Sequence, residues 1–356
     1  MIFSRQRILG PGLCLGLATV AGLASAAMET SQPEWKQLPA LPDKEGFASA
    51  FAGVSHDALL VAGGANFPGK RPWEGGAKVW YDEVFVLPAP DAAWINAGKL
   101  PRPLAYGVSV TTAEGVVCAG GGDATEHRRE VFLLKWDGRQ LHVTDLPALP
   151  GPLAFGSGVA VGRKVYLAGG LVTPAATTAA AVFWMLDLDR LAAGWRELPP
   201  CPGPGRMLAQ VGAFGETLYV CGGVALQPGP DGKAVRTYLH DHYAFRPSGK
   251  WQRLADMPQA VAAAPSPMPA SPAGELLVIS GDDGTRAHLT GPDHPGFLQE
   301  VLAYDVRRDT WRQAADAPIS RATAPTAFWQ GAWIVASGER KPGYRSPEVW
   351  MLRFLQ

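Results

Sequence analysis

A repeated pair of small residues constrains the fold of this chain more than any other feature. Each pair ends a short apolar segment, and the pairs recur at intervals of roughly 50 to 60 residues. Four copies carry Gly-Gly and the last two carry Ser-Gly. The six pairs are Gly63-Gly64, Gly120-Gly121, Gly169-Gly170, Gly222-Gly223, Ser280-Gly281 and Ser337-Gly338. Six copies of one unit predict a repeat architecture.

A tryptophan recurs near the end of the same unit, before a Leu-Pro-like stop. The five tryptophans are Trp35, Trp94, Trp195, Trp251 and Trp311, and one copy has Val143 instead. Glycine at a strand end lets neighbouring backbones approach without a Cβ, while Trp fills a space that widens away from an axis. Radial repetition buries both faces of each four-stranded sheet. The sequence therefore predicts an all-β, six-bladed β-propeller of the kelch type.

The two ends of the chain are complementary. The chain opens with a Trp-bearing strand, Trp35 to Leu38, that has no inner strands before it. It ends with a strand over residues 349–354 that has no Trp strand after it. We predict that residues 35–38 form the outer strand of the blade completed by residues 320–354, which would close the ring without a covalent bond.

Composition supports many short elements and excludes some partners. Hydrophobic residues make up 47% and charged residues 18%, below the usual quarter, and 42 Gly and 32 Pro are spread over the chain. The chain has 32 basic and 32 acidic side chains, so it lacks the excess of positive charge that is typical of nucleic-acid-binding proteins. No Cys-x-x-Cys or His/Cys cluster predicts a metal site, and we expect no cofactor.

The N-terminus has the pattern of an export signal. Arg5 and Arg7 precede an apolar stretch over residues 8–24, and Ala24-Ser25-Ala26 resembles a cleavage site. We expect residues 1–26 to be a signal peptide, residues 27–356 to be the propeller, and the mature protein to be periplasmic and free of the membrane. A membrane anchor is the alternative, but the apolar run is short and rich in glycine.

Long loops follow the repeated pairs and lie on one face of the predicted propeller, as do the blade-to-blade connections. The long loops span residues 65–80, 224–240 and 282–299. Such loops usually carry function. Arg102, Arg206 and Arg321 each precede an inner strand near this face, where guanidinium groups suit an anionic ligand. The alternative is that these arginines pair with loop carboxylates.

One segment near the C-terminus carries a family resemblance. It reads Gly338-Glu339-Arg340-Lys341-Pro342-Gly343-Tyr344-Arg345-Ser346. It resembles the G-E-x-K-P-G-x-R-[ST] loop of the bacterial N-acetylneuraminate epimerase (sialic acid mutarotase) family. Residues 51–55 with 62–65, and residues 102–109, resemble other stretches of that family. In better-known members the loop lies mid-chain, so the order here resembles a cyclically permuted branch, which a closed ring tolerates.

The resemblance implies an isomerase acting on a small acidic sugar, with no cofactor. It implies that Glu339 is the general base and Arg345 a second functional residue that holds the substrate carboxylate or stabilises the transition state. Arg206, Arg321, Arg102 and Asn66 are weaker candidates for substrate contacts. From the residues alone, without this resemblance, the preferred interpretation of Glu339 is a loop carboxylate that pairs with Arg340 or Arg345.

Two other functions remain open at this point. A propeller fold is compatible with a non-catalytic kelch module that binds a protein or a glycan, because fold alone does not determine function. The permuted order is compatible with a mutarotase for a different sugar. The six-residue spacing between Glu339 and Arg345 favours the enzyme over the binding module.

Overall fold

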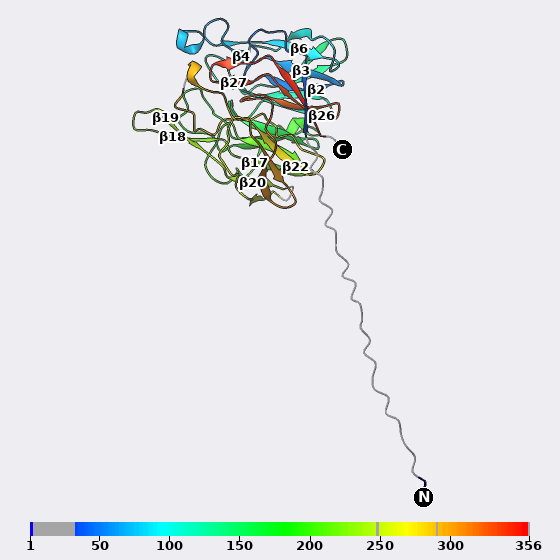
Figure 1. Cartoon of the computed structure of the whole chain (residues 1–356). Coiled ribbons are helices and arrows are strands. Elements are labelled where there is room, and N and C mark those ends of the chain that lie inside the picture. Colours follow the sequence, from blue (N-terminus) through cyan, green and yellow to red (C-terminus); the bar gives the residue numbers. More distant parts are fainter. Residues whose placement is uncertain (3–32, 247–248, 290, 355–356) are drawn as a thin grey trace. The chain divides into compact units, whose positions relative to one another are not determined.

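The computed structural model describes residues 1–2, 33–246, 249–289 and 291–354 (Figure 1). The expected signal peptide, residues 1–26, lies outside the described residues except for its first two. None of the described helices has the length and apolar character needed to cross a bilayer. We describe the unit from Ser31 to Gln356, which carries the sheets.

Six antiparallel sheets form the blades of a propeller, as predicted. The strands of each blade are given from the inner to the outer one. The first blade contains β2 (Phe51–Ser55), β3 (Ala58–Ala62), β6 (Glu83–Leu87) and β7 (Ile95–Lys99), the second β8 (Val108–Thr112), β9 (Gly115–Ala119), β10 (Val131–Trp136) and β11 (Leu141–Leu146), and the third β12 (Ser157–Val161), β13 (Lys164–Ala168), β14 (Phe183–Asp187) and β15 (Trp195–Glu197). The fourth blade contains β16 (Gln210–Phe214), β17 (Thr217–Cys221), β20 (His242–Phe245) and β21 (Trp251–Arg253), the fifth β22 (Glu275–Ile279), β23 (Val301–Asp305) and β24 (Thr310–Gln313), and the sixth β25 (Thr326–Trp329), β26 (Ala332–Ala336), β29 (Val349–Phe354) and β1 (Pro33–Leu38).

The loops between the strands of the blades contain short hairpins and turns. The hairpins are β4 (Ala65–Asn66) with β5 (Val79–Trp80), β18 (Val224–Pro228) with β19 (Ala234–Tyr238), and β27 (Glu339–Lys341) with β28 (Tyr344–Arg345). Three 3-10 turns span Pro72–Glu74, Leu191–Ala193 and Gly291–Asp293. In Figure 1 the label of β27, in red near the end of the chain, stands beside that of β4, in blue near its start.

The N-terminal strand closes the ring in the sixth blade. β1 pairs antiparallel with β29, from Pro33 opposite Phe354 to Leu38 opposite Val349. Leu38 is buried in an apolar cluster that also contains Trp329 and Met351. The predicted closure by residues 35–38 is therefore confirmed, and it extends two residues further toward the N-terminus.

A ring of backbone hydrogen bonds surrounds the axis. In every blade, the segment in the inner position is preceded by a non-glycine residue with a φ of 51° to 65°, in the left-handed region. The six residues are Ser49, Tyr106, Phe155, Leu208, Ala263 and Thr323. Each N–H donates to the carbonyl of its counterpart in the preceding blade, with N–O distances of 2.7 to 3.0 Å, and Ser49 closes the circle onto Thr323. The ring holds left-handed conformations that cost free energy in isolation.

The repeated glycines permit this crowding, as the sequence predicts. A Cβ on Gly169 would lie 2.2 Å from the carbonyl oxygen of Arg206 in the next blade, so no side chain fits there. Where serine takes that place, its hydroxyl joins the blades instead. Ser337 Oγ accepts the Phe47 N–H at 2.7 Å and donates to the Ser346 carbonyl at 2.7 Å. The tryptophans also link blades, since the Trp94 indole N–H donates to the Pro39 carbonyl of the preceding blade at 2.8 Å.

The fifth blade departs from the four-stranded unit that we expected. Its sheet contains only β22, β23 and β24 among the described residues. The segment in the inner position carries Pro265, Pro267 and Pro269, which have no N–H to donate to a ladder. Its remaining N–H groups bond to the neighbouring blades: Ser266 N to Ala324 O at 3.1 Å and Met268 N to Val211 O at 2.7 Å.

Candidate functional site

Glu339 and Arg345 lie opposite each other on the β27–β28 hairpin. Arg345 Nη1 donates to Glu339 Oε1 at 2.7 Å, and the Gly343 N–H donates to the same oxygen at 2.8 Å. Gly343 has a φ of 81°, which glycine adopts without strain, and this turn brings its N–H toward the carboxylate. The hairpin therefore holds one carboxylate oxygen with two donors.

The rest of the pair is held from the first blade. The Arg345 side chain is only 3% exposed; its Nε donates to the Ala65 carbonyl at 3.4 Å, and its guanidinium lies 4.8 Å from the Phe67 ring centre. Glu339 keeps 17% of its side-chain surface exposed. Among the described residues no hydrogen bond reaches Glu339 Oε2. The arrangement fixes the carboxylate and leaves its second oxygen available to a ligand.

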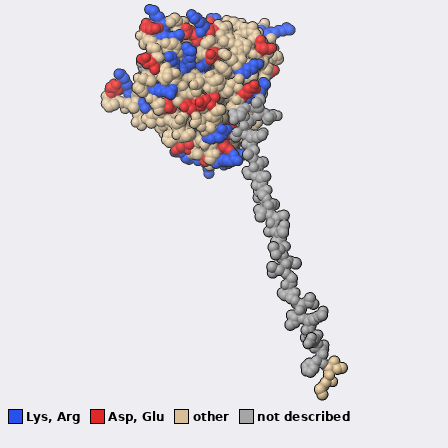
Figure 2. Space-filling model, viewed as in Figure 1, with Lys and Arg blue, Asp and Glu red and all other residues tan. Residues whose placement is uncertain are grey.

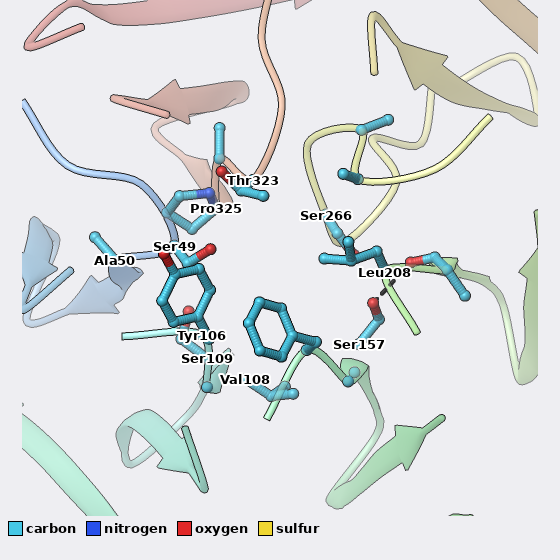
Figure 3. A pocket seen from close by; sticks show the side chains of 18 residues that line it. Ser49, Ala50, Tyr106, Val108, Ser109, Ser157, Leu208, Ser266, Thr323 and Pro325 are labelled. Carbon is cyan, nitrogen blue, oxygen red and sulfur yellow. Dashed lines mark hydrogen bonds between the residues drawn. The ribbon is translucent and has the colours of Figure 1, made fainter. Parts of the chain in front are cut away.

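A cavity of about 70 Å³ lies on the propeller axis, lined by residues at the inner edge of the blades (Figure 3). Figure 3 shows Tyr106, Leu208 and Thr323 around the cavity, together with smaller side chains such as Ser109 and Ser157. No charged side chain lines it. The hairpin is nonetheless adjacent, because the Glu339 backbone pairs with Ala322, the residue before Thr323. The hairpin that carries Glu339 and Arg345 therefore borders the lining of this uncharged cavity.

Lys78, at the end of the first long loop, was not among the residues singled out from the sequence. Its Nζ donates to the Tyr106 hydroxyl at 2.8 Å and lies 5.0 to 5.7 Å from the ring centres of Tyr106, Trp80 and Phe67. No pattern along the chain points to Lys78, because the aromatic rings come from two different blades and meet only in the folded ring.

Arg206 and Arg321 do not have the exposed placement that we expected. Both side chains are buried at a position between blades where the other four blades have Phe47, Leu104, Leu153 and Val261. Arg206 binds both oxygens of Asp241, at 2.7 and 2.8 Å. Arg321 donates to Glu348 and to Ser346 Oγ. Each guanidinium therefore has a carboxylate partner of its own, which is the alternative reading of these arginines.

Charge and burial act on the Arg321–Glu348 pair in opposite directions. Burial lowers the pKa of Arg321. Burial also raises the pKa of Glu348, but hydrogen bonds from Trp350 and the Arg321 charge outweigh it and lower that pKa overall. The lowered pKa of Glu348 keeps its carboxylate ionised beside the Arg321 guanidinium.

Arg102 and Asn66 also have partners within the protein. Arg102 is largely exposed and pairs with Glu130 at 3.2 Å. Asn66 is buried; its Nδ2 donates to the Gly46 carbonyl at 2.9 Å and its Oδ1 accepts from the Tyr81 hydroxyl at 2.8 Å. Asn66 therefore ties the loop to the blade, and the structure brings only Glu339 and Arg345 of the predicted residues into direct contact.

Other parts of the surface offer weaker sites. A groove of about 690 Å³ lies between the third and fourth blades, but its Arg163 is exposed and already pairs with Glu114 and Asp189. On the face shown in Figure 2, basic and acidic side chains are interspersed. Within the described residues, no group of three or more His, Cys, Asp or Glu side chains is placed to hold a metal ion. The hairpin that borders the cavity lining remains the best candidate site.

Comparisons with known proteins agree with the resemblance seen in the sequence. The model of the family "N-acetylneuraminate epimerase" matches residues 10–143. The N-acetylneuraminate epimerase of Brucella suis (strain ATCC 23445 / NCTC 10510) is 43% identical over 125 residues, covering 31% of this chain and 32% of that protein. The N-acetylneuraminate epimerase of Yersinia enterocolitica (serotype O:8 / biotype 1B) is 40% identical over 148 residues, covering 34% and 36%.

These matches have a defined extent. The chain spans about a third of the length of the curated relatives it matches. The family match includes the first blade, loop 65–80 and the second blade as far as the start of β11, and it ends before the Glu339–Arg345 hairpin. A solved structure titled "Structure of YjhT" aligns with a TM-score of 0.64 over 88% of this chain and 96% of that chain, at 16% identity, which confirms the propeller fold.

Proposed function

We propose that this protein is an N-acetylneuraminate epimerase, a mutarotase that interconverts the α and β anomers of sialic acid. The observation that carries the proposal is the Glu339 carboxylate, which Arg345 and Gly343 hold through Oε1 while no hydrogen bond from the described residues reaches Oε2. A carboxylate fixed in this way can accept a proton from a bound hydroxyl, a step typically worth about 10²–10⁴-fold in rate.

The reaction follows from the chemistry of a keto-sugar acid. Glu339 Oε2 takes the proton of the anomeric hydroxyl and gives it to the ring oxygen as the bond between the anomeric carbon and the ring oxygen breaks. The open keto form rotates about the adjacent carbon–carbon bond and recloses on the other face, while Glu339 carries the proton back from the ring hydroxyl to the carbonyl oxygen. Arg345 orients Glu339 and stabilises the charge that develops beside it. All atoms and charges are conserved, so no other reactant is consumed.

The similarity to named epimerases supports this proposal, and the extent of the match supports a permuted order. When a ring protein is cut at a different blade boundary, a collinear comparison aligns only the residues on one side of the new cut. High identity over a third of the chain, with the candidate hairpin at the far end of the sequence, is what such a cut produces. We also propose, from the pattern of residues 1–26, that the protein acts in the periplasm.

The direct test follows the decay of the α anomer by NMR. A sialidase releases N-acetylneuraminate as the α anomer, and the approach to the β-rich equilibrium is recorded with and without the purified mature protein. We expect acceleration in proportion to protein concentration. The Glu216→Gln variant, altered at an exposed residue in the groove between the third and fourth blades, should be as active as the wild type. An unchanged decay rate with wild-type protein would refute the proposed function.

A further inference from the structure

Lys78 is a cation held by aromatic rings rather than by a carboxylate. Its Nζ lies within 6 Å of three ring centres, at 5.0 Å from Tyr106, 5.6 Å from Trp80 and 5.7 Å from Phe67. Among the described residues, no carboxylate lies within ion-pairing distance of it. Ring faces attract a cation and leave its charge uncompensated. The ammonium has three N–H donors, and the hydrogen bond to Tyr106 uses one.

Lys78 is placed between the hairpin and the cavity. The Phe67 ring carries the Arg345 guanidinium at 4.8 Å and the Lys78 ammonium at 5.7 Å, so one side chain connects the two cations. Tyr106, which accepts the Lys78 hydrogen bond, lines the axial cavity and packs against Phe155 at 4.4 Å. Lys78 therefore lies beside both the Arg345 side of the hairpin and a residue that lines the cavity.

We propose that Lys78 is the residue that binds the carboxylate of the substrate. This inference rests on the proposed function, in which the substrate's anomeric carbon carries both the hydroxyl that Glu339 must reach and an ionised carboxylate. The Arg345 guanidinium is committed to Glu339 and to the Ala65 carbonyl and is almost fully buried. A neighbouring cation with free donors must then receive the anion, and Lys78 has both the charge and the position.

A ligand that cannot react separates binding from turnover. The methyl α-glycoside of N-acetylneuraminate cannot open its ring, and its methyl ester lacks the negative charge. Titration calorimetry measures the Kd of both for the wild type and for Lys78→Met, which keeps the apolar stem among the rings. We expect Lys78→Met to bind the acid at least about tenfold more weakly and to bind the ester as the wild type does, because a hydrogen bond to a charged group is lost.

Two further variants locate the effect. Lys70→Met removes an exposed lysine from the same loop and should leave both Kd values unchanged. Tyr106→Phe removes the hydrogen bond that positions Nζ but keeps the ring, and it should weaken binding of the acid severalfold. Raising the salt concentration should weaken binding of the acid to the wild type more than to Lys78→Met.

The outcomes keep this inference apart from the proposed function. Equal affinity of wild type and Lys78→Met for the acid, or equal losses for acid and ester, would overturn the role of Lys78. A wild type that fails to bind the glycoside would overturn it as well. If the glycoside binds through Lys78 while the α anomer decays at its spontaneous rate, the carboxylate site stands and the epimerase activity does not.

Discussion

Replacing Leu38 with alanine tests whether the N-terminal strand seals the ring. Leu38 is 4% exposed and packs with Leu41, Trp329 and Met351 in the cluster shared by the first and last blades. Buried Leu→Ala substitutions cost about 2–5 kcal/mol, depending on how far the site relaxes. Because β1 is an outer strand paired on one side only, we expect a loss of about 2–4 kcal/mol in the free energy of unfolding.

Urea denaturation followed by tryptophan fluorescence measures this change, since the chain has 12 Trp residues. The control is Gln37→Ala, an exposed neighbour on the same strand, which should change stability by less than about 0.5 kcal/mol. If Leu38→Ala costs under about 1 kcal/mol, or if Gln37→Ala costs as much, β1 does not seal the ring and the reasoning from burial is wrong.

Two other predictions concern buried titratable groups. Arg206→Met leaves Asp241 unpaired, so it should lower the free energy of unfolding by about 3–5 kcal/mol and leave the turnover of the folded protein unchanged. A fall in turnover of the folded variant would instead show that Arg206 contacts the substrate. Burial lowers the pKa of His242 from 6.5 to about 4. Between pH 6.5 and about pH 4, His242 is therefore protonated in the unfolded chain but neutral in the folded protein. As the pH drops through this range, the free energy of unfolding should fall by about 3 kcal/mol more in the wild type than in His242→Phe. Identical pH dependence of stability in the two proteins would contradict this prediction.

The repeat allowed the fold to be predicted because each of its signals has a local cause. The glycine pairs and the tryptophans act through close backbone approach and through wedges between blades, and both patterns are visible along the chain. Three alternating prolines in the fifth blade also stand out in the sequence. Their effect on the inner strand depends on which carbonyl groups of the neighbouring blades accept the remaining N–H groups, and this is seen only in the structure.

The site was only partly predictable for a related reason. Glu339 and Arg345 belong to one hairpin, so their spacing in sequence already determines that they face each other. Arg206 and Arg321 resembled surface residues because they follow loops, yet they occupy a buried position between blades. Lys78 depends on rings from two blades and on Arg345 from the far end of the chain, a proximity that only ring closure creates.

The rate at which the Glu339→Gln variant interconverts the two anomers tests the central claim most directly. Glutamine keeps an oxygen that can accept from Gly343 N and Arg345 Nη1, so its thermal stability should stay near that of the wild type while the base is lost. We expect α-to-β conversion of N-acetylneuraminate, followed by NMR, to fall by about 10²-fold or more. A folded Glu339→Gln protein that converts the anomers at the wild-type rate would contradict the account.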